Sequence, residues 1–287
     1  MYIHIAIFLW GFTGIFGKLI TLDYGQLVWY RMLLSSMGIA AYIWFTKKSF
    51  SVSKKDFLKL SGIGSIIALH WVLFYAAIKF SNASVTLSVF ASLSLFTALL
   101  EPLMTEKKFS LVEIILGAII IFGIWLITKA QEMFLTGIIV ALISTFLAAL
   151  FSVLNKKIIP HIHPETATFY ELSGGFLFLC VLLPFYLFAG NFVLQIPESM
   201  DIFYLFLLAI FCTTIAFTLS MYALQHLSVY IINLSLNLEP VYTIILAIFI
   251  LKENKELNAE FYLGAALILV TVFVYSIYQY RARKYAK

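Results

Sequence analysis

Ten apolar stretches, each long enough to cross a bilayer as a helix, constrain this chain more than any other feature of its sequence. About 20 apolar residues in a helix span the hydrocarbon core of a membrane. Lipid offers no hydrogen-bond partner to the backbone, so such segments are predicted to be helical. The sequence therefore predicts an all-α integral membrane protein with about ten transmembrane helices. The stretches cover residues 2–20, 26–46, 57–78, 83–104, 109–128, 134–155, 166–189, 202–223, 229–251 and 259–280.

The composition excludes a water-soluble fold. The chain is 63% hydrophobic and 11% charged, whereas soluble domains contain roughly 45–50% apolar and about 25% charged residues. The first stretch has no basic n-region and no small-residue cleavage site, so it is predicted to be a retained helix rather than a signal peptide. The expected partners are membrane lipid and a small-molecule substrate, with homo-oligomerisation left open. Because the lysines lie in short loops between apolar stretches, no nucleic-acid partner is expected.

The loop charges predict the orientation. Cytoplasmic loops of membrane proteins hold an excess of Lys and Arg. With both termini in the cytoplasm, thirteen basic residues lie on that side and five on the other, which favours this arrangement. The compact chain without targeting tails favours a multi-pass protein of the cytoplasmic membrane. The cytoplasmic set is Lys47, Lys48, Lys54, Lys55, Lys59, Lys107, Lys108, Lys156, Lys157, Arg281, Arg283, Lys284 and Lys287, and the opposite set is Lys18, Lys79, Lys129, Lys252 and Lys255.

The chain also repeats itself in order, which predicts two halves, 1–130 and 131–287. The offset between matching positions drifts from about 138 to 147 residues. Five helices per half is an odd number, so the second half would enter the membrane from the opposite side. Inverted repeats of this kind are typical of secondary transporters, whose substrate site lies between the halves. The matches are Lys18 with Lys156, Trp29-Tyr30-Arg31 with Phe169-Tyr170-Glu171, Phe74-Tyr75-Ala76-Ala77 with Met221-Tyr222-Ala223-Leu224, Glu106 with Glu253, and Leu116-Gly117-Ala118 with Leu263-Gly264-Ala265.

With these motifs in this order, the full length of the sequence resembles the EamA branch of the drug/metabolite transporter superfamily. The resemblance implies ten helices, cytoplasmic termini, a central cavity shared by the two halves, and transport of amino acids, other small metabolites or drugs. The sequence departs from the family pattern in its fourth stretch, where Leu93 stands at the position that Pro240 occupies in the ninth. The motifs are Trp10-Gly11 with Lys18, Trp29-Tyr30-Arg31, Tyr75-Ala76, Leu238-Glu239-Pro240-Val241 with Glu253, and Leu263-Gly264-Ala265-Ala266.

Glu239 is the first candidate for the substrate site. It lies near the middle of the ninth stretch, where a charge costs roughly 2.5–3.5 kcal/mol and is expected to face a cavity or a partner. Pro240 removes a backbone donor and is the predicted hinge of this helix. Glu239 is predicted to exchange protons or to bind a substrate amine; the alternative is a structural carboxyl. Asn233 and Asn237, four residues apart, share a helical face and either bind ligand or join helices.

Aromatic and basic residues complete the predicted site. His70 is the second proton-coupling candidate because imidazole titrates near neutral pH; the alternative is a core histidine. Trp71 and Tyr75 form a predicted aromatic wall that could hold a cation, and Trp10 and Tyr222 join the translocation set through the motifs above. Arg31 is predicted to bind a substrate carboxylate at the outer mouth and Glu171 to gate the inner one. The alternative for both is snorkelling or a local ion pair.

The leading hypothesis is a secondary transporter that moves amino acids or related metabolites by alternating access, with proton-coupled export as its stronger form. The first alternative is an exporter of lipophilic cations or drugs. A membrane-embedded lipid-modifying enzyme is the remote alternative, with Glu171, His161 and His163 as the nearest match to a catalytic cluster. No nucleotide-binding or hydrolase motif is present in the sequence, so no enzyme activity, cofactor or metal is expected.

Overall fold

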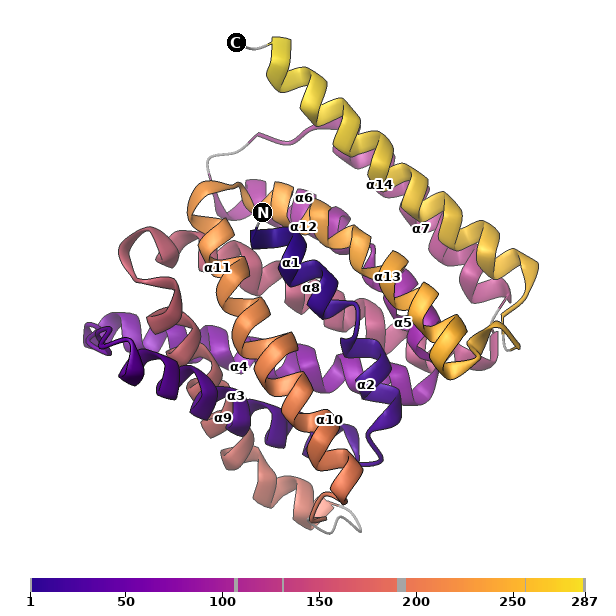
Figure 1. The fold of residues 1–287 in the computed structure, drawn as a ribbon. Helices are drawn as coiled ribbons and strands as arrows, with labels where there is room; N and C mark the ends of the chain where they lie inside the picture. Colours follow the sequence, from indigo (N-terminus) through magenta and orange to yellow (C-terminus); the bar gives the residue numbers. More distant parts are fainter. Residues whose placement is uncertain (1, 106–107, 131, 190–194, 256, 286–287) are drawn as a thin grey trace.

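A computed structural model describes residues 2–105, 108–130, 132–189, 195–255 and 257–285. Helices occupy the predicted apolar stretches, with ends shifted by a few residues, and this described part contains no β-strand (Figure 1). The α-helices are α1 (Tyr2–Trp10), α2 (Thr13–Leu19), α3 (Tyr24–Phe45), α4 (Lys54–Phe80), α5 (Ala83–Phe90), α6 (Leu93–Met104), α7 (Leu111–Ala130), α8 (Leu135–Ile158), α9 (Pro164–Ala189), α10 (Ser199–Ala209), α11 (Ala216–His226), α12 (Val229–Ser235), α13 (Glu239–Leu246) and α14 (Ala259–Tyr285).

The helices have the length and surface of a multi-pass membrane protein. Six described stretches are long and apolar enough to cross a bilayer, and three shorter apolar helices accompany them. Large apolar side chains face outward, among them Trp44, Phe45 and Phe249, which are 69%, 75% and 79% exposed. Lipid, not water, is the solvent in which such a surface is stable. The six stretches are Tyr2–Leu19, Lys54–Phe80, Ala83–Met104, Leu135–His161, Pro164–Phe185 and Ser199–His226.

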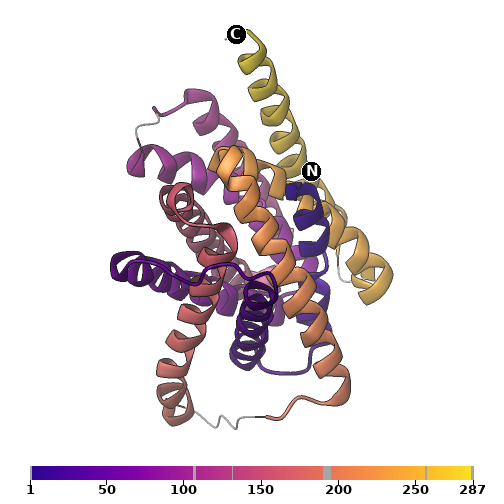
Figure 2. The ribbon, with the colours of Figure 1, turned by 60° about the vertical axis from the view of Figure 1, so that its left-hand side comes forward.

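Glycines allow the closest helix contacts. α4 packs tightly against α8 and α9, and a Cβ added to Gly64 of α4 would lie 2.0 Å from the backbone oxygen of Glu171 in α9. α7 and α14 pack along one edge of the bundle, as Figures 1 and 2 show. There, a Cβ on Gly264 would lie 2.8 Å from the oxygen of Gly123. Small residues therefore bring backbones together where lipid provides no hydrophobic drive between helices.

Three membrane-length stretches are interrupted near their middle. Two turn residues separate α1 from α2, and Ala91 and Ser92 separate α5 from α6. A 3₁₀ turn, Leu236–Leu238, separates α12 from α13. Leu93 is the first residue of α6 and Pro240 the second of α13. The fourth stretch is therefore interrupted at the position equivalent to Pro240, although it has no proline there. A proline is therefore not required for the break in the fourth stretch.

Side chains from distant parts of the sequence hold the helix ends. The Glu253 carboxylate accepts hydrogen bonds from the backbone N–H groups of Ala83 and Ser84, at 3.0 and 2.9 Å, at the start of α5. An acidic group at a helix N-terminus also complements the helix dipole. At the start of α10, Asp201 accepts from the backbone and hydroxyl of Thr21, at 2.9 and 2.6 Å. These contacts join the two halves at the same end of the bundle at which α2 ends and α3 begins.

Candidate functional site

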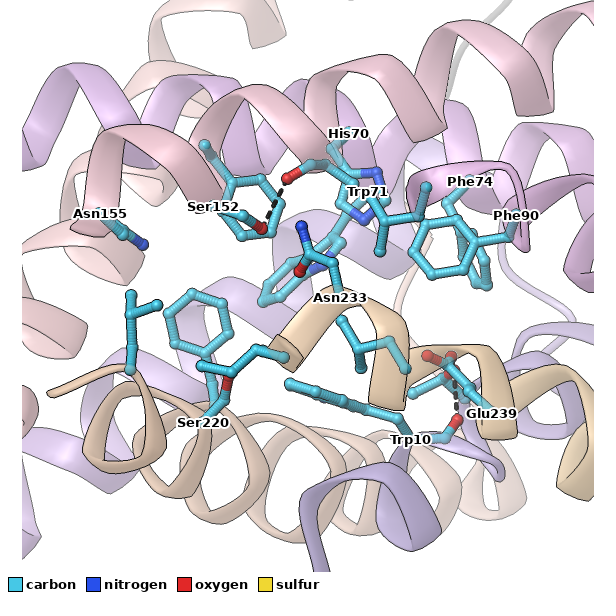
Figure 3. A pocket seen from close by; sticks show the side chains of 18 of the residues that line it. Trp10, His70, Trp71, Phe74, Phe90, Ser152, Asn155, Ser220, Asn233 and Glu239 are labelled. Atoms are coloured by element: carbon cyan, nitrogen blue, oxygen red, sulfur yellow. Dashed lines mark hydrogen bonds between the residues drawn. The ribbon is translucent and has the colours of Figure 1, made fainter. Parts of the chain in front are cut away.

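A cavity lies at the centre of the bundle, where the three interrupted stretches meet α3, α4, α8 and α11 (Figure 3). Its volume is about 90 Å³, which is room for several water molecules or a small polar group. It extends from Glu239 at one end to Asn155 at the other. The lining is mainly aromatic with a few polar groups, the usual composition of a small-molecule site. The aromatic lining residues are Trp10, Trp71, Phe74, Phe90, Phe151 and Phe217.

Glu239 enters the cavity because the helix restarts there. It is the first residue of α13 and is 5% exposed. The Thr13 hydroxyl lies 3.5 Å from its Oε1, but the same hydroxyl lies 2.6 Å from the backbone oxygen of Trp10 and donates to it. A hydroxyl has one hydrogen to donate, so the Thr13 hydroxyl donates to the backbone oxygen of Trp10 rather than to Glu239. The Glu239 carboxylate is therefore available to a ligand on its cavity side.

Arg31 lies inside the bundle rather than at an outer mouth. It is 2% exposed, so the snorkelling alternative is wrong. Its Nε donates to Thr213 at 2.7 Å and its Nη1 to the Tyr75 hydroxyl at 2.8 Å. The guanidinium carbon lies 3.7 Å from the centre of the Trp71 ring. Within the described chain, no acceptor takes the other three N–H groups, and Arg31 lines the cavity. The stacked guanidinium can therefore present donors to an anionic group.

Arg31 and Glu239 have opposite charges and line the same cavity without pairing. No ion pair of 4.0 Å or less joins them in the part of the chain that the structure describes. Two unpaired charges in a low-dielectric interior are costly, and each becomes favourable when a partner arrives. A zwitterionic ligand would provide one partner of each sign. A direct salt bridge would instead satisfy both charges and leave nothing for a ligand to bind.

His70 is held by α8. Its Nδ1 lies 2.9 Å from the Ser144 backbone oxygen and 2.8 Å from the Ser144 hydroxyl. That hydroxyl donates to the backbone oxygen of His70 at 2.9 Å. Both neighbours of Nδ1 therefore act as acceptors, so Nδ1 is assigned the hydrogen and Nε2 is an acceptor. The ring stacks on Phe90 with centroids 5.8 Å apart. Among the described contacts none joins His70 to Glu239, so a direct relay between them is not assembled in this conformation.

Asn233 links the two interrupted stretches of the fourth and ninth helices. Its Nδ2 donates to the Thr97 hydroxyl at 2.8 Å. Its Oδ1 is buried and has no protein partner among the described residues, and the side chain projects into the cavity (Figure 3). Asn233 and Glu239 reach the same cavity because the 3₁₀ turn between them changes the helical phase. The side chain of Asn237 lies outside the described part of the structure.

Two predicted residues lie near the cavity without lining it. Tyr75 is fully buried and holds Arg31 through its hydroxyl. Tyr222 belongs to a cluster near the end of α11, where its hydroxyl donates to Glu165 at 2.8 Å. Lys48, in the loop after α3, completes the cluster with a 2.5 Å ion pair to Glu165. The hydrogen bond to Glu165 raises the pKa of Lys48 above its usual value. Tyr222 therefore joins helix ends and does not contact the cavity contents.

Most of the remaining lining residues carry no signal in the sequence. Ser152 and Asn155 come from α8, Ser220 from α11, and Thr13 from α2. Small polar residues are common in membrane helices as helix-joining groups, so their type alone does not separate them from packing positions. The face that each helix turns toward the cavity depends on tertiary packing, which no single sequence pattern specifies. Asn155 and Thr13 each have a carboxyl neighbour, Glu171 at 3.4 Å and Glu239 at 3.5 Å.

A membrane-embedded helical bundle with a central, largely aromatic cavity and a few buried charges defines the class of membrane transporters. Comparison with known proteins agrees: the model of the EamA-like transporter family matches residues 1–129 and 135–277. The chain belongs to this family, which indicates a membrane transporter rather than an enzyme.

Relatives and a solved structure extend the comparison. An "Uncharacterized transporter" of Archaeoglobus fulgidus is 25% identical over 286 residues, which is 96% of each chain. "Uncharacterized transporter YxxF" of Bacillus subtilis (strain 168) is 23% identical over 255 residues, covering 84% of this chain and 78% of the relative. A solved structure titled "Crystal structure of protein" matches with a TM-score of 0.72 and 15% identity over 98% of this chain and 97% of the other. At that identity the likeness concerns the fold alone.

Proposed function

We propose that this protein is a secondary transporter that moves small zwitterionic metabolites, amino acids foremost, across the cytoplasmic membrane by alternating access. The observation that supports this most is the unpaired presence of Arg31 and Glu239 in one cavity. Arg31 would bind the substrate carboxylate with its free N–H groups, since a planar guanidinium matches a carboxylate. Glu239 would bind the ammonium group. The aromatic lining would then contact the side chain.

Alternating access would use the repeat organisation. Two consecutive family matches, one in each half, support a division into repeats at 1–130 and 131–287, each with five membrane-crossing helices. The inverted arrangement, ten crossings and cytoplasmic termini follow from the odd helix number and the loop charges. The cavity reaches toward the end of the bundle where α8 and α11 end, which is the cytoplasmic end in this topology. The halves would rock about the cavity and expose it to one side at a time.

A more specific form of the proposal is that transport is coupled to protons. A proton can replace the substrate ammonium at the Glu239 carboxylate. The movement of a proton in one direction can then be exchanged for the movement of substrate in the other. His70, with Nε2 as an acceptor beside the same cavity, is the second candidate. Coupling through these two groups requires water or substrate between them, because they are not directly bonded in the described structure.

A second candidate substrate class is lipophilic cations. Six aromatic side chains line the cavity around one carboxylate, and aromatic faces attract cations. Arg31 opposes this reading because its charge would repel such a ligand. The two classes therefore differ in whether Arg31 aids or hinders binding.

The test uses purified protein in sealed liposomes, with empty liposomes beside it. Uptake of a labelled amino-acid mixture is followed with and without tetraphenylphosphonium as a lipophilic competitor. The proposal expects uptake above empty liposomes that unlabelled amino acids suppress and the lipophilic cation does not. Uptake of labelled tetraphenylphosphonium without uptake of amino acids would establish the second candidate instead.

A further inference from the structure

A second carboxyl lies deep in the bundle, behind the cavity wall. Glu171 of α9 is completely buried and does not line the cavity. Its Oε2 accepts one long hydrogen bond, 3.4 Å, from the Asn155 amide, and its Oε1 has no partner among the described residues. It lies at the Asn155 end of the cavity, the end opposite to Glu239. Neither substrate recognition nor helix packing, as described above, uses this group.

Asn155 connects Glu171 to the cavity. It lines the cavity wall on α8 (Figure 3), and its Nδ2 donates both to Glu171 and, at 3.8 Å, to the sulfur of Met221. Its Oδ1 is buried with no protein partner within the described chain. One amide therefore has an unused acceptor beside a carboxyl with an unused oxygen. A change in the contents of the cavity would therefore alter the surroundings of Glu171 through the Asn155 side chain.

No cation neutralises Glu171 in the described structure. The helices packed around it contribute Gly64 of α4, Asn155 of α8 and Met221 of α11 at the contact. Several charged and titratable groups of these helices and of α3 have partners of their own. These are Arg31 with Thr213 and Tyr75, His70 with Ser144, Lys59 with Asp56, Lys156 with the backbone oxygens of Leu224 and Leu227, and Tyr222 with Glu165.

Burial then selects the neutral form of the carboxyl. An ionised carboxylate that is removed from water without a cation costs several kcal/mol, and one long amide bond does not offset this. A neutral carboxylic acid has one O–H donor and loses far less on burial. A bound metal ion is a poorer explanation, because sodium-sized and divalent cations need several oxygen ligands. Here the described neighbours offer the carboxyl, one amide oxygen and a thioether.

We propose that Glu171 is a proton-binding site of the transport cycle, with Asn155 as the positioning residue that links it to the cavity. In the conformation described here the carboxyl holds its proton. When the cavity hydrates or binds substrate, the Asn155 amide turns toward it, and the Glu171 proton leaves its carboxyl oxygen for cavity water. The carboxyl takes up a proton again from water that enters the cavity from the opposite side of the membrane, as the protein returns to the conformation described here. This inference rests on the proposed transport function and assigns the coupling to the end of the cavity away from Glu239.

The first experiment separates transport from coupling. Protein in liposomes is assayed for exchange of a labelled amino-acid mixture at equal pH, and for accumulation under a pH gradient imposed in each direction. Coupling to one proton accumulates substrate up to about tenfold per pH unit. In Glu171→Gln, which keeps the shape and removes the titration, exchange continues and gradient-driven accumulation falls to that of equal pH. Glu260→Gln, the same change at an exposed residue of α14, retains both activities.

The other outcomes overturn the proposal. Gradient-driven accumulation that persists in Glu171→Gln would assign coupling elsewhere, with Glu239 first. Loss of exchange together with accumulation, in protein that elutes as the wild type does in size-exclusion chromatography, would make Glu171 a structural group. Accumulation driven by a sodium gradient instead of a pH gradient would indicate a metal ion at this site.

A second measurement does not depend on the substrate. Infrared spectra of the wild type and of Glu171→Gln at neutral pH are subtracted, and the difference is compared with that for Glu239→Gln. The proposal expects a protonated-carboxyl carbonyl band in the Glu171 difference spectrum. A carboxylate band there would contradict it whether or not amino acids are transported. Absence of amino-acid exchange in the wild type, with the carbonyl band present, would reject the substrate class and leave the proton site in place.

Discussion

The α5–α6 and α12–α13 breaks occupy matching positions in the two halves of the sequence but present different side chains to the cavity. The α5–α6 break contributes Phe90 and Leu93 to the cavity, whereas the α12–α13 break contributes Asn233 and Glu239. At an offset of 147 residues, Leu93 corresponds to Pro240, and Ser92 to Glu239. Both breaks form, but only one presents a charge. The break therefore forms with different residues in the two halves, and those residues decide which side chains the cavity presents.

The second and seventh predicted helices differ in a similar way. Arg31 of α3 reaches the cavity and donates two of its five N–H groups, to Thr213 and Tyr75. Its sequence counterpart, Glu171 of α9, is buried behind the wall with an unpaired oxygen. The first half of the chain thus places a cation at the cavity, and the second half places a carboxyl one side chain away from it. The matching positions of the two proposed repeats therefore have different surroundings.

The largest expected effect on substrate affinity comes from removing the charge of Glu239 at the α12–α13 break. Glu239→Gln removes the proposed partner of the substrate ammonium, and hydrogen bonds to charged groups contribute about 1.5–3 kcal/mol, or roughly tenfold to a hundredfold in affinity. The apparent KM for amino-acid uptake should rise by that factor. Ser92→Ala, at the equivalent position of the other half, should change it less than about twofold. Equal effects of both variants would remove the distinction between the two breaks.

Arg31→Lys tests the other charge. Lysine keeps the positive charge but loses the planar fork and the stacking on Trp71, so substrate affinity should fall about tenfold. The readout is the KM for uptake, beside competition by a lipophilic cation. Unchanged amino-acid affinity with stronger inhibition by the cation would contradict the role of Arg31 as the carboxylate partner.

The hydrogen bond between the two breaks should matter for stability. Thr97→Val removes the acceptor of the Asn233 amide and leaves a buried donor unsatisfied, at a cost of about 1–3 kcal/mol. Thermal unfolding in detergent measures it. Thr145→Val is the matched control, because Thr145 is equally buried and its hydroxyl donates only within its own helix, to Ala141. A midpoint lowered equally by both variants would show that the link between the breaks contributes nothing specific.

The smallest effect is expected from Pro240→Leu, which copies the residue of the first break into the second. Proline in the first turn of a helix removes no helical hydrogen bond, and the first break forms without one. Unfolding should shift by about 1 kcal/mol or less, with uptake within about twofold of the wild type. Abolished uptake in a folded protein would instead make Pro240 an essential hinge.

The helical class and part of the cavity lining could be predicted from sequence, for identifiable reasons. Membrane-length apolar stretches force helices, and a charge in the middle of one, as at Glu239, must face a cavity or partner. The same reasoning found Arg31 but not its depth, since its side chain is long enough for either location. The break at Ser92 could not be predicted, because no proline marks it. Asn155 and Ser152 were missed because helix rotation depends on packing across the bundle.

The most direct test of the central claim is competition by substrates that lack one charged end. Exchange of a labelled amino acid in liposomes is measured against the unlabelled amino acid, its decarboxylated amine and its deaminated acid. If Arg31 and Glu239 each bind one end, removal of either group weakens inhibition by about tenfold or more, and Glu239→Gln abolishes the penalty for lacking the ammonium group. An amine that inhibits as well as the intact amino acid would contradict the two-charge site and favour a cavity for cations.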